Sequence, residues 1–243
     1  MTATPSHSTL LRQSRHWLSQ EQQRALLPII DCCFGGIAPE DYLHKYFLSE
    51  GPFERRLKLF YDGRQLVGYC LLTFSRACTR GRPLVLIGAS AAFLPAYRHG
   101  NQTLAFSIAE ALAYKLRHPL TRVYFADTMI SPAMYRVMAK ALGLIFPHPE
   151  HELDAGGRAL LKSLQCGVMD REPHWHPHLC RVGRQAQYDE TELARFRQSD
   201  KAEIRYYLDI NPDFHQGYGV LALVPVTFAN LLKTLWKRLG ARP

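Results

Sequence analysis

A short polar turn follows the most apolar stretch of the chain. Residues 84–94, LVLIGASAAFL, carry no charge, which is typical of a strand buried on both faces. The residues from Arg98 to Thr103 then form a turn with one glycine, and apolar residues recur every four positions from Leu104 to Leu116, as in an amphipathic helix. Unpaired backbone N–H groups and the positive end of the helix would meet at this turn, which suits an anion. The alternative is an ordinary connection between a strand and a helix.

A histidine-rich segment farther along the chain contains residue types that zinc prefers. These residues are His174, His176, His178 and Cys180. Their spacing matches no common zinc motif, and Pro173 and Pro177 favour an irregular loop. We therefore expect no bound metal and interpret the segment as a surface loop of a basic protein, with a zinc site as the alternative.

The composition is that of a folded domain with a basic surface. The chain has 243 residues, 47% of them hydrophobic, and a net charge of +9. A positive surface favours an anionic partner, but no run of five or more Lys and Arg occurs, so we expect no nucleic acid. The six cysteines form no Cys-x-x-Cys pair, which is typical of a reduced compartment. The N-terminal residues lack the apolar region of a signal peptide, and we expect a cytoplasmic protein.

Apolar periodicity and turn residues predict two helices, then three strands, and then alternating helices and strands. In chain order the expected elements are helices over 19–34 and 39–48, strands over 56–61, 65–74 and 84–94, a helix over 102–117, a strand over 121–127 and a helix over 133–142. Asp62-Gly63 between the first two strands is a strong hairpin signal. The three strands are therefore expected to be sequential and antiparallel.

The C-terminal part is expected to complete the same domain. Residues 147–200 are long for a connection and are interpreted as an insertion. Two strands, over 202–210 and 220–226, are expected to form a terminal hairpin. The expected division of the chain is a flexible N-terminus over 1–17, a core over 18–146, the insertion over 147–200, and a C-terminal hairpin and basic amphipathic helix over 201–243.

This order of elements resembles the GNAT (Gcn5-related N-acyltransferase) superfamily over about residues 18–146. In that family the turn after the fourth strand usually reads Q/R-x-x-G-x-G/A, and its backbone amides hold the acyl-CoA pyrophosphate. Arg98 matches the first position, whereas Asn101 and Thr103 stand where the family prefers small residues, chiefly glycine. The resemblance implies an α/β (α+β) fold in which helices flank a mixed, mostly antiparallel sheet, with an insertion before the C-terminal hairpin.

A second match runs from Ser131 to Arg136 and resembles the helix after the fifth strand of that family. That helix often carries a tyrosine near the thioester sulfur. The resemblance makes Tyr135 the acid that protonates the departing thiolate, a role that suits a phenol with an ordinary pKa near 10. The alternative is that Tyr135 only packs.

The resemblance also implies a reaction, in which an acyl group moves from a thioester donor to an amine or hydroxyl acceptor. The donor would be acyl-CoA or an acyl carrier protein, and the acceptor would lose its proton to a base, either Asp127 or a histidine acting through water. Backbone N–H groups of Ala91 to Leu94 would bind the thioester carbonyl. The residues expected to hold the donor are Phe93, Leu94, Arg98, His99, Gly100, Asn101, Gln102 and Thr103.

A second interpretation is a catalytically silent GNAT-like module that binds a protein partner or a membrane. The altered turn, the long insertion and the basic C-terminal helix favour it. That helix carries cations beside one apolar stripe, formed by Phe228, Leu231, Leu232, Leu235, Trp236 and Leu239. Such a stripe either docks on its own domain or lies on an anionic surface, here the inner face of the membrane or an acidic carrier protein.

Overall fold

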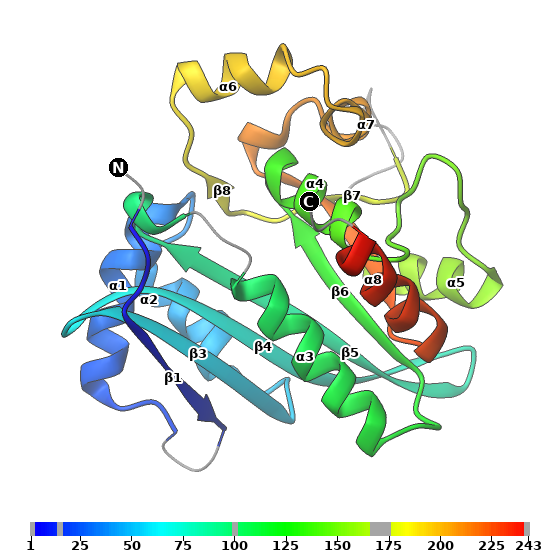
Figure 1. Cartoon of the computed structure of the whole chain (residues 1–243), viewed down its shortest axis with the longest axis horizontal. Helices are drawn as coiled ribbons and strands as arrows, with labels where there is room; N and C mark the ends of the chain where they lie inside the picture. Colours follow the sequence, from blue (N-terminus) through cyan, green and yellow to red (C-terminus); the bar gives the residue numbers. More distant parts are fainter. Residues whose placement is uncertain (1–2, 14–16, 99–101, 166–175, 241–243) are drawn as a thin grey trace.

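The described part of the chain forms one large mixed sheet with helices on both faces (Figure 1). The computed structural model describes residues 3–13, 17–98, 102–165 and 176–240. Within them, seven strands pair in the order β1-β3-β4-β5-β6-β9-β7, and β2 and β8 form a separate pair. Neighbouring strands are antiparallel except β5 and β6, which are parallel. The predicted fold class is therefore confirmed.

The strands are β1 (His7–Arg12), β2 (Phe34–Gly35), β3 (Glu54–Asp62), β4 (Gln65–Thr79), β5 (Arg82–Phe93), β6 (Val123–Met129), β7 (Leu179–Arg181), β8 (Gln185–Ala186) and β9 (Tyr218–Pro225). The α-helices are α1 (Gln20–Cys33), α2 (Pro39–Leu43), α3 (Gln102–Arg117), α4 (Pro132–Ala141), α5 (Ala155–Leu164), α6 (Glu190–Arg197), α7 (Ala202–Ile210) and α8 (Phe228–Gly240). A π-helical turn (His44–Leu48) continues α2, and short 3₁₀ turns cover Pro95–Tyr97 and Phe214–Gln216.

Strand alternation places two hydrophobic layers on opposite faces of the sheet. On β4, Cys70, Leu72 and Phe74 belong to the core beneath α3. Their neighbours Tyr69 and Leu71 belong to the core beneath α1 and α2. Successive side chains of a strand point to opposite faces, so α3 covers one face and the N-terminal helices cover the other (Figure 1).

Two expected elements take another form. Residues 7–12, placed in a flexible N-terminus, form strand β1 and pair antiparallel with β3 along the sheet edge. Residues 202–210, expected as a strand, form helix α7, so β9 pairs with β6 and β7 rather than closing a terminal hairpin. The aromatic and branched residues of this segment favour a strand. However, Ile204, Tyr207 and Ile210 recur every three residues, so that a helix buries all three.

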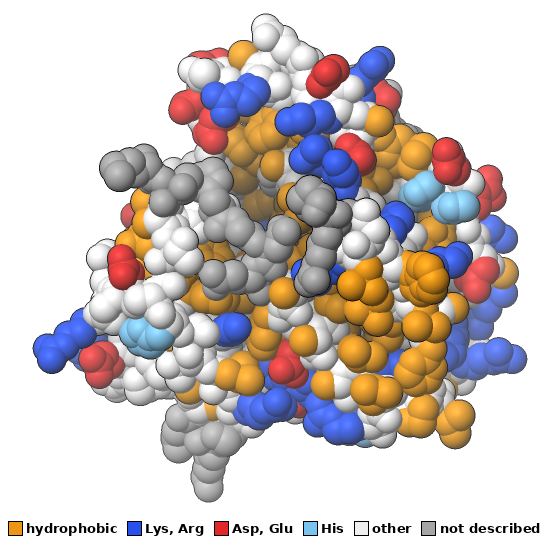
Figure 2. All heavy atoms as spheres, viewed as in Figure 1, with side chains coloured by type: hydrophobic (Ala, Val, Ile, Leu, Met, Phe, Trp, Pro, Cys, Tyr) orange, Lys and Arg blue, Asp and Glu red, His pale blue; other side chains and the backbone are white. Residues whose placement is uncertain are grey.

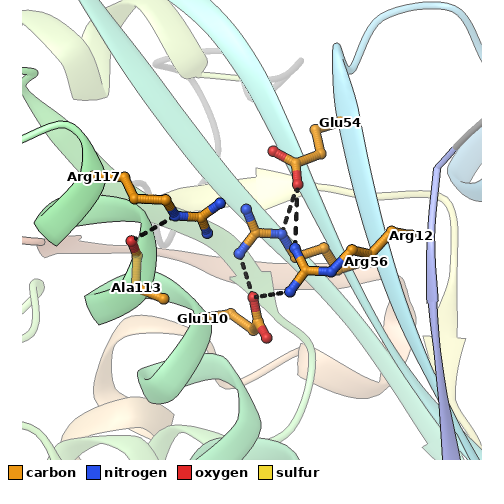
Figure 3. Close-up of polar contacts among 6 residues, drawn as sticks. All are labelled: Arg12, Glu54, Arg56, Glu110, Ala113 and Arg117. Carbon is orange, nitrogen blue, oxygen red and sulfur yellow. Dashed lines mark hydrogen bonds and ion pairs between the residues drawn. The ribbon is translucent and has the colours of Figure 1, made fainter.

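A buried ion-pair network ties α3 to the strands below it (Figure 3). Arg56 of β3 is fully buried, and its guanidinium group lies 4.4 Å from the ring centre of Phe74. Its Nε donates to Glu54 at 2.8 Å, and its Nη1 donates to Glu110 of α3. Arg12 of β1 approaches the same two carboxylates at 3.9 Å from a more exposed position. The network fixes the position of α3 over the sheet.

We predict that Glu110→Ala lowers the free energy of unfolding by about 1.5–3 kcal/mol, because it removes one charged hydrogen-bond partner of buried Arg56, which keeps Glu54. Arg12→Ala, the matched control at the exposed end of the network, should cost about 0–1 kcal/mol. Urea denaturation followed by circular dichroism measures both. Equal, small losses in the two variants would show that the buried pair does not anchor α3.

Candidate functional site

The parallel pair β5–β6 separates halfway along its length. Backbone pairing joins Val85 to Val123, Leu86 to Tyr124 and Ile87 to Phe125. No pairing between these strands follows within their described residues, although β5 continues to Phe93 and β6 to Met129. The sheet therefore opens into a gap at the carboxyl ends of these strands, the edge at which parallel strands commonly place ligands.

Register with β4 decides which backbone groups of β5 face this gap. The Leu94 N–H donates to the Val67 carbonyl at 2.9 Å, and hydrogen-bonded and non-hydrogen-bonded pairs alternate along an antiparallel ladder. Ala91 and Phe93 pair with Cys70 and Gly68 at the alternate positions, so their N–H groups point away from β4 and toward the gap. Of the segment expected to bind a thioester carbonyl, Leu94 is thus engaged in the sheet, whereas Ala91 and Phe93 remain oriented toward the gap.

Asp127 lies on β6 two residues beyond Phe125, the last residue that pairs with β5, and it pairs with Ala222 of β9 on the other side. Because side chains alternate along a strand, Asp127 lies on the same face of the sheet as Phe125. Its Oδ1 is nevertheless 3.9 Å from Nη2 of Arg184, a residue on the opposite face of the sheet. The open gap permits this approach. The Thr128 N–H donates to the same oxygen at 2.9 Å. Burial raises the pKa of Asp127 to about 7, although the Arg184 charge and the Thr128 N–H lower it. A carboxyl group with this pKa can accept a proton near neutral pH.

A cavity of about 420 Å³ opens beside Asp127. Its wall comes from β4, β5 and β6, from the π-helical turn, and from the insertion, which contributes Arg181, Val182 and Arg184. Ser90 on the β5 wall hydrogen-bonds the hydroxyl groups of Tyr42 at 2.6 Å and Tyr69 at 3.1 Å. A volume of this size accommodates a small substrate.

The insertion over 147–200 builds this wall and extends the sheet. Its strand β7 pairs with β9, and β8 pairs with β2 at the end of α1. Gly183 supplies a positive φ of 68° at the turn between β7 and β8. The turn places Arg184 in the cavity wall, where the side chain is buried and its Nη1 donates to the Tyr46 hydroxyl. No pattern in the sequence singled out Arg184, because nothing local shows that this segment returns to the sheet.

Tyr135 lies away from the cavity. Its hydroxyl donates to the Pro147 carbonyl at 2.8 Å, the side chain is buried, and it is not among the residues lining the cavity beside Asp127. Burial raises the pKa of Tyr135 well above its ordinary value. The hydrogen bond holds the chain that follows α4, so the geometry favours the packing alternative over the acid.

Tyr188 of the insertion is a second tyrosine near the gap, which the sequence reasoning missed. Its hydroxyl oxygen is enclosed, makes no hydrogen bond of normal geometry to a described residue, and lies close to Ser131, which follows β6. The charge of Arg98, which follows β5, also acts on it. Burial raises the pKa of Tyr188 to about 12. The hydroxyl is therefore influenced by one residue that follows β6 and by one that follows β5.

The expected donor turn is described only in part. His99, Gly100 and Asn101 lie outside the described residues, as does the side chain of Gln102. The Arg98 guanidinium donates to the Phe93 carbonyl at 3.3 Å, and the carbonyl of Thr103 accepts from the Ser107 hydroxyl within α3. The role of the turn in binding a donor stays a prediction.

A cationic groove lies beside the first turn of α3. It encloses about 420 Å³ and is lined by Leu104 of α3, by Arg136 and Lys140 of α4, and by Lys237 and Arg238 of α8. Positive side chains at the start of a helix suit an anionic group. The groove therefore places four basic side chains beside the first turn of α3, of which Arg136 also pairs with Glu203 at 3.7 Å and Lys237 also donates to the Leu142 carbonyl.

The histidine-rich segment is described only in part. His174 lies outside the described residues, and His178 is buried with its Nδ1 2.6 Å from the Leu221 carbonyl. Burial lowers the pKa of His178 to about 4, so it is a structural, neutral residue. Among described residues, a separate group at the surface, His148, Glu150 and His151, has atoms within 4.8 Å of one another that could hold a metal ion. The expectation of no bound metal stays a prediction.

No protein-family model matches the sequence, and no curated protein matches it. Similar solved structures include a conserved protein of unknown function from Enterococcus faecalis V583, with 15% identity over 55% of this chain and a TM-score of 0.38. This chain covers 32% of the length of that protein. The GNAT family N-acetyltransferase YhbS from Escherichia coli, in complex with CoA, shares 14% identity over 56% of this chain and 69% of its own, with a TM-score of 0.38. Escherichia coli ElaA shares 17% identity over 61% of this chain and 95% of its own, with a TM-score of 0.37. The similar structures thus include a member of the family that the sequence resembles.

Proposed function

We propose that this chain is a GNAT-like acyltransferase whose reaction takes place in the gap between β5 and β6. The observation that carries the proposal is Asp127, a buried carboxyl group with a pKa of about 7 that lies between a strand gap and a cavity of about 420 Å³. Perturbed carboxyl groups beside a cavity are frequent at reaction sites. The observations that support each step are the strand amides, Asp127 and Tyr188.

The donor thioester enters the gap with its carbonyl oxygen toward the N–H groups of Ala91 and Phe93. These groups belong to a rigid strand and point away from β4, so they are oriented before the reaction begins. Fixed donors of this kind stabilise the negative charge that develops on the carbonyl oxygen. The hydrogen bonds strengthen as the tetrahedral intermediate forms.

The acceptor nitrogen attacks the thioester carbon from the cavity. A nitrogen–carbon bond forms, and Asp127 takes the proton that the nitrogen loses, directly or through water. The carbon–sulfur bond then breaks. The departing thiolate takes a proton from the Tyr188 hydroxyl, which is close to Ser131 after β6. Asp127 and Tyr188 thus have opposite roles, as base and acid.

Acyl-CoA fits the donor side because its phosphates would lie near permanent cations. Arg136, Lys140, Lys237 and Arg238 line the groove beside the start of α3. Arg98 supplies a further exposed cation at the end of β5. An acyl carrier protein would present its thioester on a phosphate-bearing arm to the same cations, so both donors remain within this proposal.

A helix surface favours a second function, binding to an anionic membrane. Most of the stripe on α8 does not dock on the domain, because Trp236, Leu239 and Leu232 are 76%, 65% and 56% exposed. Leu231 alone among its described residues packs against the core. Polar Asn230 and Thr234 face the domain instead and bond to the loop after α4. Figure 2 shows hydrophobic side chains gathered over α8, with Lys and Arg beside them. Among the described helices none is long and apolar enough to cross a membrane, so the helix would lie on the surface.

We predict that kcat/KM rises about tenfold per pH unit up to pH about 7 and then levels off. Below its pKa Asp127 is protonated and accepts no proton, and above it the carboxylate is available. Asp127→Asn should lower kcat by about 10²–10⁴-fold. The matched control is Asp209→Asn, an exposed carboxylate on α7. Thioester consumption from pH 5 to 9 measures the profile. A flat profile, or full activity of the Asp127→Asn variant, would show that Asp127 is not the base.

We predict opposite effects from two Tyr→Phe substitutions. Tyr188→Phe should lower kcat by about 10²–10⁴-fold with little change in the melting temperature, because it removes an acid whose hydroxyl makes no hydrogen bond of normal geometry to a described residue. Tyr135→Phe should keep turnover and lower stability by about 1 kcal/mol, because it removes the hydrogen bond to the Pro147 carbonyl. Turnover and a melting curve, measured for each variant, show which tyrosine is the acid and which stabilises the fold. If Tyr135→Phe lost turnover and Tyr188→Phe kept it, the acid would be Tyr135 and not Tyr188.

We predict that the protein sediments with vesicles of phosphatidylcholine and phosphatidylglycerol but not with vesicles of phosphatidylcholine alone. The double variant Leu232→Ser/Trp236→Ser should weaken this binding about tenfold or more, since each buried apolar side chain contributes about 1.5–3 kcal/mol. Leu48→Ser is the control, because Leu48 is exposed on another element. Self-association without vesicles, or equal binding by the double variant, would assign the α8 stripe to another partner or to none.

A further inference from the structure

The cavity beside Asp127 has an excess of positive charge. Its wall contains three cationic side chains, Lys45, Arg181 and Arg184, and one carboxyl group, Asp127. Lys45 and Arg181 are exposed, whereas Arg184 is buried. The cations come from the π-helical turn and from the insertion, which are far apart in the sequence. A wall of this composition repels a cation and attracts an anion.

Arg184 has hydrogen-bonding capacity that the described residues do not use. Its Nη1 donates to the Tyr46 hydroxyl, and its planar group lies 4.9 Å from the ring centre of Tyr46. Its Nη2 reaches Asp127 only at 3.9 Å, which is longer than a hydrogen bond. Its Nε is enclosed and has no acceptor among the described residues. A guanidinium group held by a ring, with unused donors, is suited to a planar or tetrahedral anion.

The cavity lies on the acceptor side of the proposed reaction. Ser90 and Leu71, which line it, belong to the face of α1 and α2, and the cationic groove assigned to the donor phosphates borders α3 on the opposite face. A thioester in the gap would separate the two. Resting on the proposed function, the cations of this cavity are therefore placed to recognise the acceptor.

We propose that the acceptor carries an anionic group, a carboxylate or a phosphate, which binds Arg184 while its amine faces Asp127. Because Arg184 and Asp127 are only 3.9 Å apart, a short chain must separate the amine from the anionic group. Lys45 and Arg181 lie where they attract such a molecule to the cavity. Simple representatives of this class are an α-amino acid and phosphoethanolamine.

The test compares matched amines with and without the anionic group. Alanine is paired with ethylamine, and phosphoethanolamine is paired with ethanolamine, with acetyl-CoA as the donor and the acetylated product measured by mass spectrometry. We expect kcat/KM to be about 10–100-fold higher for the anionic member of at least one pair, the factor that a hydrogen bond to a charged group corresponds to. Arg184→Gln should reduce that ratio toward one, mainly through KM, because the anionic group then loses its partner. Arg195→Gln is the control, since it removes an exposed charge from the same insertion outside the cavity.

A binding measurement separates this inference from the proposed reaction. Calorimetry with alanine or phosphoethanolamine needs no turnover, and binding that is weakened by Arg184→Gln but not by Arg195→Gln supports the anion site even if no thioester is consumed. Turnover without a preference for the anionic amines would support the proposed acyltransferase and overturn the inference that the acceptor carries an anionic group. Neither binding nor turnover would overturn both.

Discussion

The early end of the β5–β6 pairing is the constraint on which the proposed chemistry depends. Beyond Ile87 and Phe125 the two strands no longer pair with each other, although β5 stays paired with β4 and β6 stays paired with β9. Backbone N–H groups of Ala91 and Phe93 then face a gap instead of a partner strand, and Asp127 has room to reach across the sheet. Unpaired N–H groups and a carboxyl group would lower the free energy of unfolding in a closed core, because buried polar groups require hydrogen-bond partners. A polar ligand bound between the strands would supply these partners.

The rest of the fold holds the two sides of this opening in place. On one face, the buried Arg56 joins α3 to β3 through Glu110. β7 extends the sheet by pairing with β9, and β8 pairs with β2 at the end of α1, so that the insertion is fastened beside the cavity. The insertion thereby supplies both Arg184 and Tyr188, so what the sequence presented as an addition to a core instead completes the wall of the proposed site. Walls that hold the base, the amides and the cations at fixed separations would lower the cost of reaching the proposed transition state.

Local patterns predicted the central part of the molecule well. The apolar run 84–94, the Asp-Gly turn and the periodicity of Leu104 to Leu116 each depend on neighbours in sequence, and all three elements formed. Patterns failed where the result depends on tertiary packing. Residues 202–210 suit a strand by composition, and α7 forms because a helix buries Ile204, Tyr207 and Ile210 together. The resemblance to the GNAT superfamily makes Tyr135 the acid, but only the folded chain shows that its hydroxyl bonds to the Pro147 carbonyl. Arg184 and Tyr188 come from a segment without a recognisable motif.

The central claim is that a thioester carbonyl binds in the gap between β5 and β6. A crystal structure with a carba analogue of acetyl-CoA, in which a CH₂ group replaces the sulfur and the carbonyl is kept, tests it most directly. We expect the carbonyl oxygen about 3 Å from the N–H nitrogen of Ala91 or Phe93, with the methyl ketone facing the cavity beside Asp127. An analogue bound elsewhere on the chain while the gap is closed by side chains would contradict this account.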